Sequence, residues 1–543
     1  MRHPLTLLLT LICLLLALPV LGVLSAWFAL DAAALAVLKH QLQTVLPDYA
    51  LQSLLLAGGV AIGVMVLGAA TAAAVTLFEF PGRRVFEWAL LLPLAMPAYV
   101  LAYAWTDALQ YSGPLQTALR QTLGPSLGLK GALWPDVRSL PMAVLLFVLC
   151  LYPYVYLLTR TALGERAVRL MEAARLLGAP MRRRVLEVAL PMARPAIAAG
   201  TALALMETLA DYGVGSYFGL TTFSTGIYKA WLVMNDRVAA AQLSAVLLLV
   251  VAVVLTAERA AQRRLRFASS RTAAPSADAR PLALRGGAAA GVMLLCALPV
   301  LLGFVLPVAW LMRMLWQEAQ FSEFGLPLAR FSQWALSSFR LAAAAALAAT
   351  ALALALAFAL RQRHGTLLQP AVRMLSLGYA VPGAVIAIGI LLPVGWLQAR
   401  WPDAGAAALA TGTVFGVLYA YLVRFSAVAL QSVEAGYARL PMSIDETART
   451  LGSSPRRLFT ELHLPLLRRS AAAAALLVFV DVMKELPATL VLRPFGSDTL
   501  AVVAYNLARD ERLAEAALPS LAIVVVGLIP VILLSRALRA PAG

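Results

Sequence analysis

The sequence predicts an all-α polytopic membrane protein with about 12 transmembrane helices, arranged as two parallel six-helix repeats. Hydrophobic residues make up 62% of its 543 residues and charged ones only 13%, with a mean hydropathy of +0.83. A soluble domain has about 25% charged residues. A charged segment also occurs twice, at 172–178 and at 446–452, 274 residues apart. The alternating pattern of a membrane barrel is absent, so the spans are expected to be helices.

Twelve apolar runs are long enough to cross a hydrocarbon core of about 30 Å, which takes about 20 helical residues. They lie near residues 5–30, 50–78, 88–109, 140–159, 195–216, 238–257, 288–312, 336–360, 367–397, 406–430, 470–492 and 516–536. The first run exceeds the roughly 7–15 apolar residues of a signal peptide, which predicts an uncleaved anchor. Prolines inside spans, such as Pro97 and Pro382, are expected chiefly as packing features.

Basic residues predict the orientation of the spans. Eight arginines lie between residues 160 and 194, seven between 259 and 285, and six between 439 and 469. The positive-inside rule places these segments, and both termini, in the cytoplasm. The net charge of +17 is therefore a topology signal. Nucleic-acid binding is not expected, because these arginines lie in short loops between spans.

Cysteine and histidine give no sign of a catalytic or metal centre. Cys13, Cys150 and Cys296 lie in or beside apolar runs and lack ligand spacing, so neither a disulfide framework nor a zinc site is predicted. The four histidines form no ligand motif. We expect a protein that is not an enzyme and carries no cofactor.

The duplicated segment sets the organisation of the chain. It runs E-A-A-R-L-L-G from Glu172 to Gly178 and E-T-A-R-T-L-G from Glu446 to Gly452, and Leu-Pro follows each copy. Six spans separate the copies, so both face the same side of the membrane. Parallel repeats predict a pseudo-two-fold axis along the membrane normal and a pathway where the halves meet. The predicted domains are an N-terminal half at 1–257, a flexible cytoplasmic linker at 258–287 and a C-terminal half at 288–543.

Each copy is predicted to form helix, sharp turn, helix. Gly178 can end the first helix in the left-handed conformation, and the second is expected to begin near Pro180 and stop at Pro191. In the other copy Ser454 is a predicted N-cap, followed by Pro455 at the first helical position. A surface helix-turn-helix that serves only topology is the simpler interpretation. Glutamate, small residues, glycine and Leu-Pro recur in register, which favours a surface for a partner bound twice.

These motifs resemble the cytoplasmic coupling loop of permease subunits in binding-protein-dependent ABC importers. The resemblance covers essentially the whole chain, as two fused permease halves of the type I importer fold with coupling loops at 160–194 and 432–469. It implies that a short helix of each loop docks one subunit of a cytoplasmic ATPase dimer. The residues implied in docking are Glu172, Ala173, Ala174, Gly178, Glu446, Ala448 and Gly452. Thr447 departs from the pattern, because it replaces the middle alanine.

The chain has no means of hydrolysing ATP itself. A Walker A loop needs Gly-Lys-Ser/Thr to hold phosphates and magnesium. The lysines are Lys39, Lys130, Lys229 and Lys484, and none follows a glycine. The ATPase is therefore expected to be a separate polypeptide.

Acidic residues recur inside the membrane at the same 274-residue offset. They are Glu207 and Asp211 in one half and Asp481 and Glu485 in the other. Charges at this depth usually face a bundle interior or a water-filled path, and carboxylates suit a hard trivalent cation. A structural role is an equal alternative: Lys484 could neutralise Asp481 or Glu485, or the acids could cap broken helices near Gly213 and Pro487.

The stretches around these acids, A-D-Y-G with S-Y-F-G and K-E-L-P-A-T-L with L-R-P-F, look like those of ferric-iron importer permeases. The resemblance implies a multi-pass permease in the bacterial inner membrane that receives ferric iron from a periplasmic binding protein. Related permeases carry thiamine, phosphonates, sulfate or polyamines, so these substrates stay open. A secondary transporter driven by protons through the four acids is a further alternative.

Overall fold

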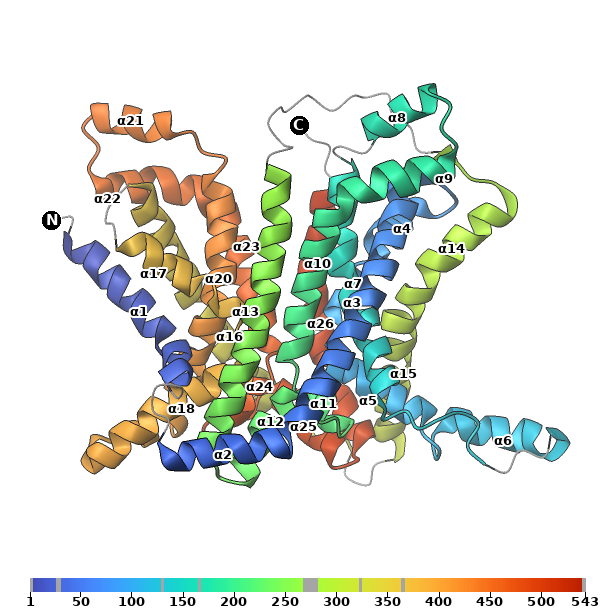
Figure 1. Cartoon of the computed structure of the whole chain (residues 1–543), viewed down its shortest axis with the longest axis horizontal. Coiled ribbons are helices and arrows are strands. Elements are labelled where there is room, and N and C mark those ends of the chain that lie inside the picture. The colour runs from blue at the N-terminus through green and yellow to red at the C-terminus, as the bar shows by residue number, and fades with distance from the viewer. Residues whose placement is uncertain are drawn as a thin grey trace. The chain divides into compact units, whose positions relative to one another are not determined.

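The computed structural model describes residues 3–25, 31–127, 131–164, 168–266, 282–321, 325–362 and 367–539. Figure 1 shows that these residues are almost entirely helical. Within them, ten helices are long and apolar enough to cross a membrane, and an eleventh span is a helix pair bent by 91°. The helix Leu464–Met483 begins 274 residues after Leu190–Ala210, which lies in one of the ten. When this helix is counted as a further span, the described residues contain the twelve spans that the sequence predicts.

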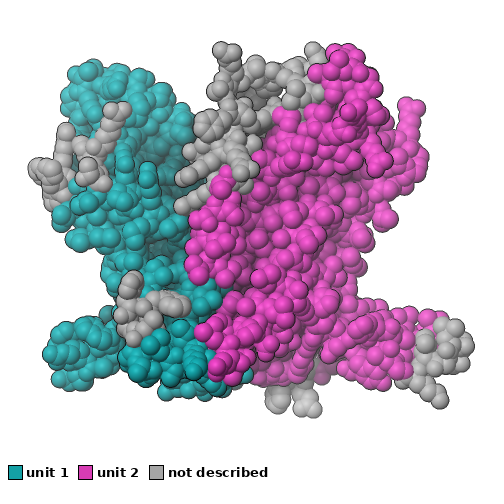
Figure 2. Space-filling model, viewed as in Figure 1, with its two compact units in different colours: residues 1–40, 227–248, 328–503 teal, residues 41–226, 249–327, 504–543 magenta. Residues whose placement is uncertain are grey.

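The chain folds into two compact units, coloured separately in Figure 2. Unit 1 comprises residues 1–40, 227–248 and 328–503, and unit 2 comprises residues 41–226, 249–327 and 504–543. Each unit thus takes segments from both halves of the sequence. The elements that cross a unit boundary are α2 (Ala32–Gln43), α12 (Phe223–Tyr228), α13 (Arg237–Arg266) and α25 (Leu500–Arg509).

Unit 1 is built around three mutually packed helices, α16 (Leu328–Arg361), α20 (Phe415–Tyr437) and α23 (Leu464–Met483). The first helix of the chain, α1 (His3–Ser25), packs on α17 (Leu368–Leu375) and α18 (Gly383–Arg400). The remaining elements are η4 (Lys229–Val233), η6 (Gly378–Ala380), η7 (Pro402–Ala404), α19 (Ala406–Thr411), α21 (Met442–Thr450), α22 (Pro455–Arg457), η8 (Leu458–His463) and α24 (Pro487–Leu492).

Unit 2 repeats this core with α3 (Leu46–Leu77), α7 (Leu140–Ala162) and α10 (Leu190–Ala210). Glycines allow the backbones of these helices to approach closely. A Cβ atom added at Gly68 would lie 2.6 Å from the Cβ of Val155, and a Cβ atom added at Gly200 would lie 2.6 Å from the Cα of Val155. Small residues at such contacts are the usual basis of helix packing in membranes. Helix α14 (Gly286–Val300) contacts α3, and η5 (Leu301–Val305) contacts α7. Helices α15 (Leu306–Phe321) and α26 (Leu513–Arg539) pack on each other and on α5 (Ala98–Leu109).

The other elements of unit 2 are short. They are β1 (Phe78–Glu79), α4 (Arg83–Ala89), η1 (Leu92–Ala95), α5 (Ala98–Leu109), α6 (Pro114–Leu127), α8 (Val168–Leu176), α9 (Met181–Arg183), η3 (Arg184–Ala189), α11 (Gly213–Tyr217) and β2 (Leu282–Ala283). Strands β1 and β2 pair in parallel. Pro97 and Pro382 are the N-cap residues of α5 and α18, so each third span is broken at its proline.

The predicted linker at 258–287 is described only at its two ends. Residues 258–266 continue helix α13, and residues 282–283 form β2. Residues 267–281 lie outside the described residues. The three cysteines are buried and unbonded to one another.

Candidate functional site

The two predicted docking segments form the same structure in both copies. Helix α8 leads to Gly178 at φ +79°, and α21 leads to Gly452 at φ +81°. The amide of Ala179 donates to the carbonyl of Ala174, and the amide of Ser453 donates to that of Ala448, each at 3.0 Å. These bonds are those of a Schellman turn, which needs a left-handed residue. The predicted role of Gly178 as a left-handed terminator is confirmed.

The second helix of each copy continues into the membrane, so the predicted stop at Pro191 is wrong. In unit 2, α9 runs through η3 into α10, and in unit 1, α22 runs through η8 into α23. Both η3 and η8 are π-helical and end just before Leu-Pro. Proline lacks an amide hydrogen and crowds the carbonyl four residues earlier. The wider π turn accommodates it without ending the helix. The predicted N-cap at Ser454 is confirmed, since its side chain accepts from the amide of Arg457 at 3.3 Å.

Most of the predicted docking residues are accessible. Ala173, Gly178, Glu446 and Gly452 are exposed, and Ala174 and Ala448 are half-buried. Glu172 lies within α8, but its side chain is outside the described residues. Each segment thus presents a small, open surface.

Sequence reasoning missed one apolar residue in each segment. Leu177 is 87% exposed and Leu451 81% exposed, and they stand at the same repeat position, directly before the left-handed glycine. A single exposed leucine is ordinary, but one that recurs at the same position of both segments is in keeping with the predicted contact surface for a partner bound twice. The 274-residue offset was the signal in the sequence that could have identified the pair.

Two of the intramembrane acids cap short helices. The carboxylate of Asp211 accepts from the amides of Val214 and Gly215, at the start of α11. The carboxylate of Glu485 accepts from the amides of Ala488 and Thr489, at the start of α24. The short helices lie directly after α10 and α23, where each span is broken. This geometry corresponds to the structural alternative for Asp211 and Glu485.

The other intramembrane charges lie near these two acids. Lys484 Nζ lies 2.9 Å from Asp481 Oδ1, so this acid is paired within its own turn. Glu207, the repeat counterpart of Asp481, is half-buried in α10. Arg424 of α20, which the sequence did not single out, lies 3.5 Å from Glu485 and is 8% exposed. Among the described residues, no three His, Cys, Asp or Glu side chains gather as a group that could hold a metal ion.

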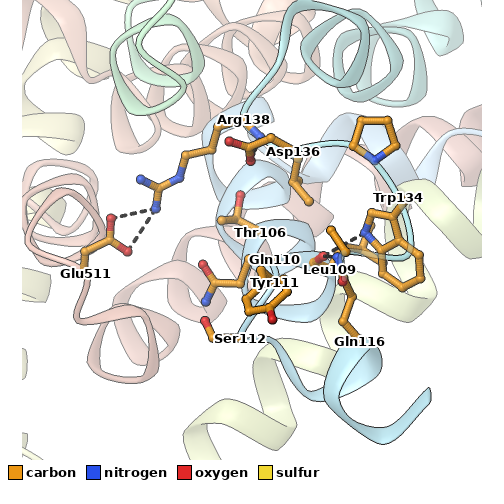
Figure 3. A pocket seen from close by; sticks show the side chains of 13 residues that line it. Thr106, Leu109, Gln110, Tyr111, Ser112, Gln116, Trp134, Asp136, Arg138 and Glu511 are labelled. Carbon is orange, nitrogen blue, oxygen red and sulfur yellow. Dashed lines mark hydrogen bonds and ion pairs between the residues drawn. The ribbon is translucent and has the colours of Figure 1, made fainter. Parts of the chain in front are cut away.

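A cavity of about 440 Å³ lies where α5 ends and α7 begins, at the end of unit 2 opposite α8 (Figure 1). Figure 3 shows Arg138 reaching Glu511 across its rim, at 2.7 and 2.9 Å. The indole of Trp134 donates a hydrogen bond to the carbonyl of Leu109 at 2.8 Å, which links two residues of the cavity lining. Glu511 has φ +62°, a conformation that costs a non-glycine residue about 1–2 kcal/mol. Strain of this kind is often found at functional positions.

Comparison with known proteins identifies the family and several relatives. The family described as "Binding-protein-dependent transport system inner membrane component" matches residues 64–267 and again 349–540. The "Fe(3+)-transport system permease protein FbpB 2" of Haemophilus influenzae is 26% identical over 493 residues, 88% of this chain and 87% of that protein.

Two shorter relatives match part of the chain. The "Putative 2-aminoethylphosphonate transport system permease protein PhnV" of Salmonella typhimurium is 31% identical over 29% of this chain and 56% of its own length. The "Molybdenum transport system permease protein ModB" of Escherichia coli is 30% identical over 25% of this chain and 55% of its own length.

Proposed function

This chain belongs to the binding-protein-dependent transport system inner membrane components, and we propose that its substrate is ferric iron. It is a multi-pass ABC importer permease with two fused halves. In the proposed cycle, a periplasmic binding protein delivers iron, and a separate ATPase dimer drives its passage to the cytoplasm. In this cycle the separate ATPase hydrolyses ATP, and the chain itself catalyses no reaction.

The duplicated segment is the observation that carries the proposed coupling to an ATPase. Helices α8 and α21 each end in a left-handed glycine, and each presents an exposed leucine beside it. We infer that both dock on the ATPase dimer, one per subunit, through the residues Glu172, Ala173, Ala174, Gly178, Glu446, Ala448 and Gly452. This places α8, α21 and both chain termini in the cytoplasm. Positive charge around both segments supports the same orientation.

The cavity at the other end of unit 2 would then face the periplasm. Its rim carries Asp136, Arg138 and Glu511. Paired charges on an exposed rim suit a partner that must be recognised and then released, because electrostatic complementarity favours fast association. We propose this rim as a contact for the periplasmic binding protein.

For the path itself we propose two roles for the intramembrane charges. Asp211 and Glu485 hold the short helices α11 and α24 at the break of each span, and so shape the wall of the path. Glu207, Asp481 and Lys484 are half-buried and would meet the passing substrate. Charged side chains inside a membrane usually line such water-filled paths.

Ferric iron is favoured because the iron permease matches nearly the whole length of the chain, in both halves. The phosphonate and molybdenum permeases match 29% and 25% of it. An oxyanion remains the second candidate, since Arg424 supplies a buried cationic group in unit 1. Thiamine is a further candidate from the resemblance of the motifs.

The docking proposal is tested by ATP-dependent uptake of radioactive ferric iron into proteoliposomes. Glu172 and Glu446 are each changed to Ala and to Lys. Loss of a docking contact at one site is expected to lower uptake about tenfold, the effect of about 1.4 kcal/mol in binding. Uptake that matches the unaltered protein in all four variants would contradict docking through these residues.

The same vesicles distinguish the substrates and the energy source. Iron uptake should be unaffected by excess molybdate, 2-aminoethylphosphonate or thiamine, whereas competition by one of them would identify that solute instead. Uptake that follows a proton gradient in vesicles without any ATPase would favour the proton-driven transporter.

A further inference from the structure

The second coupling helix, α21, is tied to the membrane helices by a buried ionic cluster. The Arg361 guanidinium, at the end of α16, donates from Nε to Asp445 Oδ2 and from a terminal nitrogen to Asp445 Oδ1, each at 2.9 Å. The two side chains are 8% and 2% exposed. A bidentate pair of this kind fixes direction as well as distance.

Arg361 also fastens the turn that leads into α21. It donates to three backbone carbonyls, those of Tyr437 at 3.3 Å, Leu440 at 3.0 Å and Pro441 at 2.9 Å. A second link lies alongside, since Arg449 of α21 donates to the side chain of Gln362. The end of α16 thus holds the end of α20, the turn and α21 together.

His463 extends the cluster to the start of α23. Its fully buried ring lies with Nε2 3.1 Å from Asp445 Oδ1 and Nδ1 3.2 Å from the hydroxyl of Tyr437. One neutral tautomer satisfies both contacts: Nε2–H donates to Asp445, and the tyrosine hydroxyl donates to Nδ1. We call Arg361, Tyr437, Asp445 and His463 the clamp.

The first repeat is built differently at the matching positions. Met171 stands at the position of Asp445, and Ala189 stands at that of His463, both 274 residues earlier. Both are buried, and α8 contacts η3. The first coupling helix therefore rests on apolar contact at positions where the second has an acid and an imidazole.

We propose that Arg361 is a positioning residue that makes α21 move as one body with α16 and α23, so that displacement of α21 by the ATPase reaches the membrane helices. The clamp gives α21 an ionic link to α16 through Arg361 and a hydrogen-bonded link through His463 to η8, which runs into α23. The inference rests on the proposed docking of an ATPase at α21. Because α8 lacks the acid and the imidazole of the clamp, we expect the two coupling helices to transmit force unequally.

The test uses the full chain with the ATPase subunits that purify with it, in proteoliposomes. Arg361→Gln and Asp445→Asn remove the clamp, and Arg361→Lys keeps charge without the two-pronged geometry. Arg457→Gln is the matched control, because its pair with Glu461 lies in the same segment but is 66% and 60% exposed. Three quantities are measured: bound ATPase, ATP hydrolysis and iron uptake.

We expect the clamp variants to keep their ATPase and hydrolyse ATP while uptake per ATP falls about tenfold, a typical coupling between sites. Arg361→Lys should be intermediate, and Arg457→Gln unchanged. Unchanged uptake per ATP in Arg361→Gln and Asp445→Asn overturns the proposal. Loss of ATPase from these variants also overturns it, since the clamp would then shape the docking surface only. If the unaltered chain binds no ATPase, the docking proposal fails instead.

Hydrogen exchange tests the clamp without any partner. In the purified full chain, Arg361→Gln should speed amide exchange in α21 and leave α8 unchanged. Equal exchange of α21 in the variant and the unaltered chain contradicts the rigid link, whatever the transport result.

Discussion

At the scale of single residues, the exposed leucines of the coupling helices are the most direct targets. Leu177→Asp and Leu451→Asp are each expected to weaken retention of the ATPase at least tenfold, because burial of a leucine side chain contributes about 1.5–3 kcal/mol. Retention is measured by titrating the ATPase onto the immobilised chain. Ser332→Asp, an exposed residue at the start of α16, controls for added charge. Undiminished binding by both leucine variants would remove these side chains from the interface.

The clamp also makes stability depend on pH. Burial lowers the pKa of His463, and the charges of Arg361 and Arg449 lower it further against the opposing carboxylate of Asp445. Burial raises the pKa of Asp445, but the guanidinium of Arg361 and the ring of His463 outweigh it and hold the pKa below its usual range. Both groups bind protons more tightly in the unfolded chain.

Since both pKa values are depressed on folding, their stabilisation is present at neutral pH and lost in acid. The contribution of His463 to the free energy of unfolding begins to be lost below about pH 6.5, the pKa of a histidine side chain in the unfolded chain. The unfolding temperature of the purified chain should therefore fall from pH 7.5 to pH 5.5, and His463→Gln should reduce that fall. An equal fall in the variant would assign the effect to other groups.

At the scale of elements, the contact between α1 and α18 depends on one glycine. A Cβ at Gly389 would lie 2.1 Å from the carbonyl oxygen of Pro19, and one at Gly22 would lie 3.0 Å from that of Gly389. The Tyr419 hydroxyl of α20 also donates to the carbonyl of Leu15 in α1. The first helix is thus held by backbone contact that tolerates no added atom at Gly389.

Gly389→Ala is expected to push α1 away from α18 and to destabilise the chain by about 1–3 kcal/mol, the usual cost of overpacking. The change is measured as a lower thermal unfolding midpoint in detergent. Gly58→Ala in α3 is the matched control, because a Cβ there meets no atom within 4 Å. A midpoint lowered equally by both substitutions would contradict the close contact.

Elements whose ends are set by local chemistry could be predicted from the sequence. The left-handed Gly178 and the cap at Ser454 depend only on neighbouring residues, and both are confirmed. The continuation of the helix through Pro191 could not be predicted, because Leu-Pro alone is equally typical of a stop. The clamp escaped prediction for another reason: Arg361 and Asp445 are 84 residues apart, and arginines near a cytoplasmic loop are explained by topology alone.

At the scale of the whole molecule, hydropathy and the internal repeat predicted the helical class and the approximate number of spans. They did not predict how segments group into units. Helix α1 belongs to the unit of α16, α20 and α23, whereas α14 and α15 belong to the unit of α3, α7 and α10. An apolar helix face shows that a partner exists, but lipid and every other span are equally apolar. The choice of partner is decided by local shape, as at Gly389.

This grouping has a consequence for the order of biosynthesis. Helix α1 leaves the ribosome well before its partners α17 and α18, which end only at Arg400. At about 5–20 residues per second, α1 spends on the order of 20 to 75 s without them. Its buried face, with Leu9, Cys13 and Leu16, must contact lipid or the insertion machinery during that interval. Unit 1 is therefore completed late in translation, although α1 is made long before the helices it packs on.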